Sequence, residues 1–221
     1  MRPAGLAILT VLGSGLACGV DGEWVDVAVA ASTERAVQEA LDTQATGGPL
    51  LLNANASSHL ARQIVDGAPA DMFLSADEAW ADAVAAERPV LARVDLLHNR
   101  IVEVHAEGAR GCTALADPDH VPAGRYAKKG LEAAGRWPPA DLVPFPTGPA
   151  AARAVANGDC AAGFVYATDA LAAGLEPVRT LDVRATYPLL LLQERGRVVY
   201  GALQSPAARE AFVRHGFEVS P

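Results

Sequence analysis

The chain has 221 residues, of which 51% are hydrophobic and 20% are charged, and its formal net charge is −8. This composition excludes an intrinsically disordered chain. The negative charge argues against binding to nucleic acid or to anionic membranes, both of which attract basic surfaces. The three cysteines form no CxxC or Cys/His pattern, so neither a disulfide-dense scaffold nor a structural zinc site is expected. We therefore expect an acidic, well-packed globular protein.

Residues 1–18 have the features of an export signal. Arg2 gives a positive start, and the apolar stretch over 4–16 is too short and too glycine-rich for a membrane span. The residues before Cys18 resemble a bacterial lipobox, although Gly15 stands where that pattern usually has leucine. Two alternatives stay open for Cys18, lipidation of the mature protein or loss with the cleaved peptide. In either case we expect the protein in the periplasm or at the outer face of the cytoplasmic membrane.

After Trp24, short apolar runs alternate with helical patterns. The expected elements, in chain order, are strand 25–31, helix 33–41, strand 50–53, helix 59–66, strand 71–75, helix 80–86, strands 101–105 and 113–116, helix 123–134, strand 142–144, helix 150–156, strands 163–166 and 188–192, and helix 206–214. The helices are assigned from i,i+4 apolar pairs such as Leu60 and Ile64. This alternation predicts an α/β fold with mainly parallel sheets.

The strand-to-helix junctions carry the residues most suited to binding. Each junction combines small, hydroxyl or proline residues, namely Ser32, Ser57 with Ser58, Pro122–Gly124, Gly148 with Pro149, and Tyr166–Thr168. In open α/β sheets such junctions lie at the carboxyl edge, where ligands bind. Helix N-termini present free N–H groups and a partial positive charge, which favour an anion. A single junction of this kind is ordinary helix capping, so only their convergence would make a site.

An enzyme is the main alternative from a different class. Ser57, His59 and a distant aspartate are conceivable as a serine hydrolase set. The two residues are only two positions apart at a helix start, which aims their side chains differently, and the chain has no GxSxG motif. The histidines have no HxH or HExxH spacing, so no direct metal-ion ligands are expected. We therefore expect a binding protein rather than an enzyme.

Several sequence blocks resemble the extracytoplasmic molybdate-binding proteins of bacterial ABC importers. The most specific block is DPDHVPAGRYAK over 117–128, and SSHLARQI over 57–64 with GAPADMFLSAD over 67–77 is nearly as specific. GFVYATDA over 163–170 extends the resemblance, which runs from about Val25 to Phe217. The resemblance implies a high-affinity receptor that captures molybdate, and tungstate as well, and delivers it to a permease and its ATPase. It implies no cofactor.

The resemblance also implies the two-lobe periplasmic-binding-protein fold of type II. Each lobe is then a mainly parallel sheet flanked by helices, and the ligand lies in the cleft between the lobes. We expect lobe 1 over 24–99, lobe 2 over 100–185, and a return to lobe 1 over 186–221. A monomer is expected, with no nucleic-acid partner, and a membrane contact only through a lipid on Cys18.

The resemblance assigns the oxyanion ligands to neutral donors. These are the hydroxyls of Ser32, Ser57 and Tyr166, together with backbone N–H groups at Ser32, Ser57, Ala123 and Gly148. Ser58 is the alternative to Ser57 if the register of the serine pair differs by one residue. Gly148 departs from the family, which usually has valine there, and Glu34 places a carboxylate near the expected anion.

Neutral donors suit a fully ionised tetrahedral dianion such as molybdate. Charge-assisted hydrogen bonds are worth about 1.5–3 kcal/mol each, so six or seven exceed the roughly 12 kcal/mol of nanomolar binding. Phosphate keeps a proton near neutrality, and that proton would need an acceptor. Sulfate has the same charge and shape, so another tetrahedral oxyanion remains the alternative ligand.

In the fold that the resemblance implies, Cys112 and Cys160 open neighbouring strands of lobe 2. Adjacent strands lie about 4.8 Å apart, within the span of a disulfide. Export to an oxidising compartment permits the bond. We therefore expect a Cys112–Cys160 disulfide, with two free thiols as the alternative.

Overall fold

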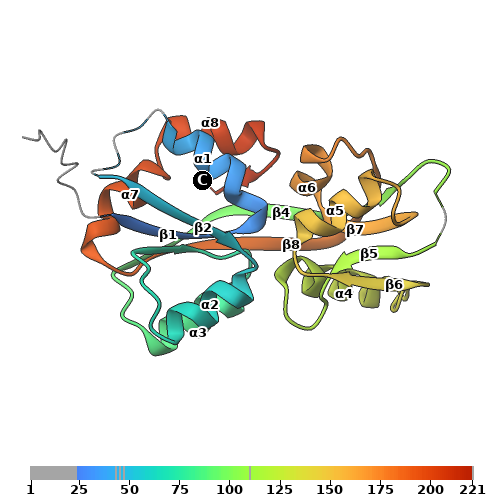
Figure 1. Ribbon diagram of the computed structural model, residues 1–221, viewed down its shortest axis with the longest axis horizontal. Helices are drawn as coiled ribbons and strands as arrows, with labels where there is room; N and C mark the ends of the chain where they lie inside the picture. The colour runs from blue at the N-terminus through green and yellow to red at the C-terminus, as the bar shows by residue number, and fades with distance from the viewer. Residues whose placement is uncertain (1–23, 43, 45, 47, 110, 221) are drawn as a thin grey trace, which may run out of the picture.

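The computed structural model describes residues 24–42, 44, 46, 48–109 and 111–220. The expected export signal over 1–18, with the lipidation candidate Cys18, lies outside these residues. The described residues form one nine-stranded sheet in the order β2-β1-β3-β8-β4-β7-β5-β6, with β9 paired to β4 off this path. Helices cover both faces of the sheet in each half of an elongated molecule (Figure 1). The predicted α/β architecture is confirmed.

The first half is built on three parallel strands, β1 (Val25–Ala30), β2 (Leu50–Asn55) and β3 (Met72–Leu74). Its connecting helices are η1 (Ala31–Thr33), α1 (Glu34–Asp42), α2 (Ser57–Val65) and α3 (Glu78–Glu87). The α1 helix lies on one face of the sheet, and α2 and α3 lie on the other (Figure 1). The central strand β1 is buried at five of its six residues because helices cover both of its faces.

The second half repeats this plan with β5 (Thr113–Ala116), β6 (Leu142–Phe145) and β7 (Ala162–Tyr166), which pair in parallel. Its helices are α4 (Pro122–Ala133), α5 (Gly148–Ala156) and α6 (Ala167–Ala172). The α4 helix lies on the same side of the sheet as α2 and α3, whereas α5 and α6 lie on the side of α1 (Figure 1).

Two long antiparallel strands, β4 (Ala92–His105) and β8 (Pro177–Leu191), join the halves. At one end β8 pairs with β3, and at the other end β4 pairs with β7. Both strands are far longer than the predicted 101–105 and 188–192. The outer part of β8 alternates buried and exposed residues with charged side chains outward, which hid it from a search for apolar runs.

The final segment returns to the first half. It contains η2 (Glu194–Gly196), α7 (Arg197–Ala202), α8 (Pro206–Arg214) and β9 (Glu218–Val219). The α8 helix packs against α1, and β9 pairs with β4. The predicted lobe boundaries stay predictions, but both fall within the long strands, where Asn99 of β4 pairs with Ala185 of β8.

Buried aromatic rings fill the region where the halves meet. Tyr187 on β8 is fully buried, and its ring centroid lies 5.7 Å from that of Tyr166 and 5.5 Å from that of Phe217. Such ring pairs contribute about 0.5–1.5 kcal/mol each beyond their burial. The packing fixes Tyr166 at the carboxyl end of β7, next to the expected site.

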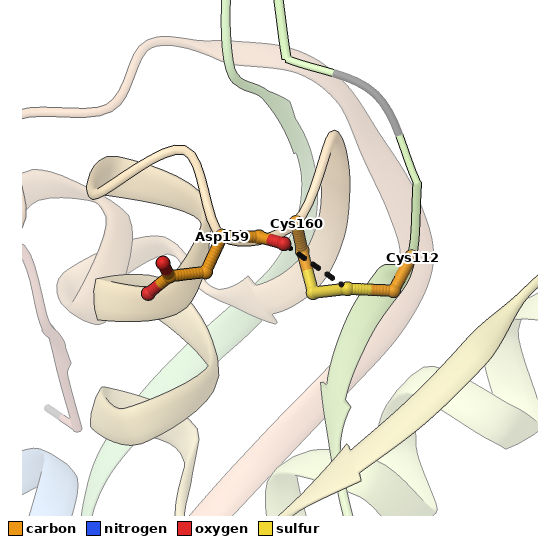
Figure 2. The surroundings of a disulfide bond; sticks show 3 residues. All are labelled: Cys112, Asp159 and Cys160. Carbon is orange, nitrogen blue, oxygen red and sulfur yellow. Dashed lines mark hydrogen bonds between the residues drawn. A yellow bond between two sulfur atoms is a disulfide. The ribbon is translucent and has the colours of Figure 1, made fainter.

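The structure contains the Cys112–Cys160 disulfide that the sequence analysis expects (Figure 2). The two Cα atoms are 4.7 Å apart, because β5 and β7 are neighbouring parallel strands and each cysteine just precedes its strand. The bond closes a loop with a sequence separation of 48 residues. It ties together the start of β5 and the start of β7, at the end of these strands remote from Tyr166.

Candidate functional site

A small cavity lies where the starts of several helices from both halves face one another. Its volume is about 20 Å³, far below the roughly 300–1,000 Å³ of a pocket for a drug-sized ligand. Its lining residues are Ala30, Ala31, Ser32, Asn55, Ala56, Ser57, Ala76, Val121, Pro122, Ala123, Thr147, Gly148, Pro149 and Tyr166. All five predicted ligand residues, Ser32, Ser57, Ala123, Gly148 and Tyr166, are therefore brought together. Ser58 is buried behind Ser57 and is not among the lining residues.

The first half contributes two hydroxyl groups. Ser57 is the first residue of α2 and is 1% exposed, and its Oγ accepts a hydrogen bond from Ala76 N at 2.9 Å. Ser32 lies in η1, directly after β1, with its Oγ 3.2 Å from the hydroxyl oxygen of Tyr187. Because each Oγ has a partner on one side only, it keeps hydrogen-bonding capacity toward the cavity.

The second half contributes two helix starts and a phenol. Ala123 follows Pro122 in the first turn of α4, and Gly148 is the first residue of α5. The next residue of α4 is Gly124, where a Cβ would overlap with Ala116 O and the Asp117 carbonyl, so glycine lets α4 begin close to β5. Tyr166 donates from its hydroxyl to Ala76 O at 3.4 Å, and burial keeps its pKa well above the usual value. The phenol therefore stays protonated, and its single O–H group donates to a ligand when it turns from Ala76 O toward the cavity.

The helices that start at the cavity differ in their capping. The α3 and α8 helices are capped by the side chains of Asp77 and Ser205. The α5 helix is capped by Thr147, whose Oγ1 accepts from Ala150 N. The residues before η1, α2, α4 and α6 make no side-chain cap hydrogen bond, and they are Ala30, Ala56, Val121 and Tyr166. The first N–H groups of a helix lack intrahelical partners, so these starts leave donors for a bound group.

No arginine, lysine, aspartate or glutamate is among the described residues that line the cavity. The described part of the chain also contains no group of three His, Cys, Asp or Glu residues that could hold a metal ion. The arrangement is a set of neutral donors with the partial positive charges of helix N-termini. It can bind a small anion without a counter-charge.

Three contacts join the halves beside the cavity. Tyr166 and Ala76 form one of them. In the second contact, the indole N–H of Trp80 on α3 donates to His120 O at 3.1 Å. In the third, Nη1 of Arg125 on α4 lies 3.0 Å from Oδ2 of Asp77. The described structure is therefore one in which the two halves are closed against each other on the α3–α4 side.

The chain from residue 25 to residue 218 matches the family described as bacterial extracellular solute-binding protein. It is 32% identical to the molybdate-binding protein ModA of Escherichia coli K12, over 98% of this chain and 96% of that protein. The chain belongs to the bacterial extracellular solute-binding proteins.

Solved structures of other binding proteins have the same fold as this solute-binding protein. The periplasmic molybdate-binding protein of Azotobacter vinelandii matches with a TM-score of 0.74 at 16% identity, covering 89% of this chain and 100% of that one. The sulfate-binding protein SubI of Mycobacterium tuberculosis matches with a TM-score of 0.72 at 14% identity, covering 89% of this chain and 86% of that one. The two-lobe arrangement is thus shared with receptors for tetrahedral oxyanions.

The sequence analysis of this solute-binding protein missed the polar residues that support the cavity from behind. Asn99 on β4 donates from Nδ2 to Thr168 Oγ1 at 2.8 Å and to the Tyr187 hydroxyl at 3.3 Å. Tyr187 in turn meets Ser32, so a buried chain of hydrogen bonds orients the Ser32 hydroxyl. Sequence alone gives no signal that Tyr187 meets residue 32.

A second group beside the cavity was also missed. The carboxyl group of Asp169, in the first turn of α6, is 5% exposed, and its Oδ2 has no hydrogen-bond partner among the described residues. Burial raises its pKa to about 8, against an opposing effect of Arg153. A neutral carboxyl group therefore lies against Gly148 near neutral pH.

Proposed function

We propose that this solute-binding protein captures molybdate outside the cytoplasmic membrane and delivers it to the permease and ATPase of an ABC importer. The observation that carries the proposal is the convergence of two serine hydroxyls, a tyrosine hydroxyl and three helix starts without side-chain caps on one small cavity. The 32% identity to a molybdate-binding protein supports it. Export, with or without a lipid on Cys18, is part of the proposal.

The chemistry of the cavity supports a fully ionised tetrahedral dianion. We assign ligand roles to the hydroxyls of Ser32, Ser57 and Tyr166 and to the backbone N–H groups at Ser32, Ser57, Ala123 and Gly148. Each such donor to a charged oxygen contributes about 1.5–3 kcal/mol. Phosphate near neutrality carries a proton that needs an acceptor, and no carboxylate is among the described lining residues. Tungstate has the charge and shape of molybdate and is proposed as a second ligand.

Sulfate is the second candidate ligand. The fold of a sulfate-binding protein matches this chain, and neutral donors accept any tetrahedral dianion of suitable size. The two ligands differ in size and not in charge, so direct competition separates them. A catalytic role for Ser57 is not proposed, because its Oγ bonds Ala76 N and no histidine is among the described lining residues.

Isothermal titration calorimetry of the mature protein tests the proposal. We expect one-to-one, saturable binding of molybdate that survives an excess of sulfate and of phosphate. Ser57→Ala is expected to weaken binding by about 10- to 150-fold, which is the loss of one charge-assisted hydrogen bond. Ser58→Ala is the matched control, since it makes the same change at the adjacent buried position outside the cavity lining, and it should stay within about threefold.

Binding that is lost equally in Ser57→Ala and Ser58→Ala, with both variants folded by circular dichroism, would contradict the assigned site. If molybdate and tungstate gave no binding heat but sulfate gave saturable heat, the cavity would still be the binding site and sulfate would be its ligand.

A further inference from the structure

A second, larger cavity adjoins the small one on the α1–α5 side of the molecule. Its volume is about 160 Å³, and it shares Ala31, Ser32 and Pro149 with the lining of the small cavity. It is bounded by the start of α1, by α5 and α6, and by the C-terminal residues His215 and Phe217. In Figure 1 these helices lie on the face of the sheet opposite to α2, α3 and α4. The two cavities are therefore neighbours that share Ser32 in their linings.

The two sides of the molecule differ in how the halves meet. On the α3–α4 side, the Trp80–His120 hydrogen bond and the Arg125–Asp77 ion pair close the halves together. The space on that side, lined by Asp77, Arg125 and Lys129 among others, shares no described residue with the small cavity. Between α1 and α5, the described residues form no hydrogen bond or ion pair from one half to the other. Among the described residues, α1 and α5 therefore lack a polar contact of the kind that joins α3 to α4.

Two arginines line the larger cavity. Arg35 on α1 and Arg153 on α5 are both exposed, and neither makes an ion pair or a side-chain hydrogen bond within the described part of the chain. They face the same cavity from opposite halves. His215 also lines this cavity, and its Nε2 lies 2.7 Å from Glu39 Oε2.

Two acidic residues line the same cavity and oppose this effect. Glu34 is exposed and precedes Arg35, so its carboxylate repels an approaching anion. Asp169 is buried, and burial raises its pKa to about 8, so its carboxyl group is largely neutral at neutral pH. The lining therefore holds two exposed arginines against one exposed acidic residue, Glu34.

We propose that the 160 Å³ cavity is the route by which the oxyanion reaches and leaves the binding cavity, and that Arg35 and Arg153 attract it there. This inference rests on the proposed function and adds the direction of approach and the residues that set its rate. A cleft lined by charge of one sign raises association rates by about 10- to 1,000-fold, and added salt weakens the effect. Glu34 opposes the two arginines here, so the increase is expected to fall at the low end of this range. Arg35 and Arg153 are steering residues in this scheme, because neither lines the small cavity.

Stopped-flow fluorescence with sodium molybdate measures the effect on the folded, mature protein. The fluorescence of Trp80 should report closure, because its indole on one half donates a hydrogen bond to His120 O on the other. The Trp80→Phe variant shows how much of the fluorescence change comes from this residue. We expect Arg35→Gln and Arg153→Gln each to lower the association rate constant by about 3- to 10-fold at low ionic strength, and by less in about 0.5 M salt. Glu34→Gln should raise it.

Lys129→Gln is the matched control, because it removes one positive charge from the cavity on the α3–α4 side. It should leave the association rate constant within about 1.5-fold. Ala172→Trp, which fills the proposed route, should slow association and dissociation together and leave the equilibrium constant nearly unchanged, as a blocked path requires.

The proposed route would be overturned if Lys129→Gln lowered the association rate constant as much as the arginine variants do, or if both arginine variants kept the wild-type rate constant. In either case, calorimetry of the wild-type protein would still detect molybdate binding. Absence of molybdate binding by the wild-type protein would overturn the proposed function itself, so the two failures are distinguishable.

Discussion

The Cα atom of Gly148 lies against the carboxyl group of Asp169, and a Cβ on residue 148 would overlap with Oδ2 of that carboxyl group. This relationship gives a physical reason for glycine at a position where the resembling family usually has valine. The α5 and α6 helices both begin at the cavity, and the glycine lets the Asp169 side chain occupy the space between their starts.

Gly148→Val should destabilise the protein and weaken oxyanion binding, because overpacking of a buried site costs about 1–3 kcal/mol. Asp169→Ala removes the clashing carboxyl group, so the double variant should recover most of the stability lost by Gly148→Val. Thermal unfolding of the three variants gives the coupling energy. Gly201→Ala is the control, since nothing lies within 4 Å of a Cβ built there. Simple additivity of the two changes would contradict the contact.

The pKa of Asp169 predicts how stability depends on pH. Burial raises this pKa from 3.8 to about 8, so between these pH values the folded chain binds more protons than the unfolded chain. The stability that this carboxyl group contributes is full below about pH 4 and is lost as the pH rises through about 8. The melting temperature of Asp169→Asn should therefore rise relative to that of the wild type as the pH increases from about 5 to about 9.

The check is the difference in melting temperature between wild type and Asp169→Asn across this range, measured by circular dichroism. Asp182→Asn, at an exposed aspartate of β8, should leave the wild-type profile unchanged. A constant offset between Asp169→Asn and wild type would mean that the buried carboxyl group does not titrate in this range.

The ion pair between Arg125 and Asp77 should slow release of the bound oxyanion. It joins α4 of one half to the start of α3 in the other, at 3.0 Å, and the Asp77 side chain is 8% exposed. Arg125→Ala should raise the dissociation rate constant by about 2- to 5-fold, in keeping with about 0.5–1 kcal/mol for a partly exposed pair. Stopped-flow displacement measures this rate.

Arg93→Ala is the control for this variant, because the Arg93–Asp82 pair lies within the first half. An equal change in both variants would show that surface charge, and not closure of the halves, sets the release rate.

The Cys112–Cys160 disulfide should stabilise the fold without affecting the binding cavity. A loop with a sequence separation of 48 residues corresponds to about 4 kcal/mol in the chain-entropy treatment. The double variant Cys112→Ser/Cys160→Ser should lose stability of this order in urea unfolding, while its affinity for molybdate stays close to wild type. Equal stability of the double variant and the wild-type protein would contradict the prediction.

Much of the fold follows from local pattern. The strand over 113–116 and the helix over 206–214 were predicted with the bounds that the structure has, because apolar spacing and a capping serine mark them locally. The lengths of β4 and β8 did not follow, since their outer residues become strand only by pairing with each other. The short α7 and β9 were missed for a similar reason, because each depends on packing against the returning chain.

The sequence by itself determined which residues could donate to an anion, because strand ends, helix starts and motif blocks are local features. The junctions and the family resemblance pointed to Ser32, Ser57 and Tyr166 as donors, and the structure shows that all three line one cavity. Only the tertiary structure decided how these donors are supported, since the partner of Ser32 is Tyr187, 155 residues away. It also decided that one side of the molecule is latched and that Asp169 holds its proton, because burial and long-range contact arise only when the two halves pack together.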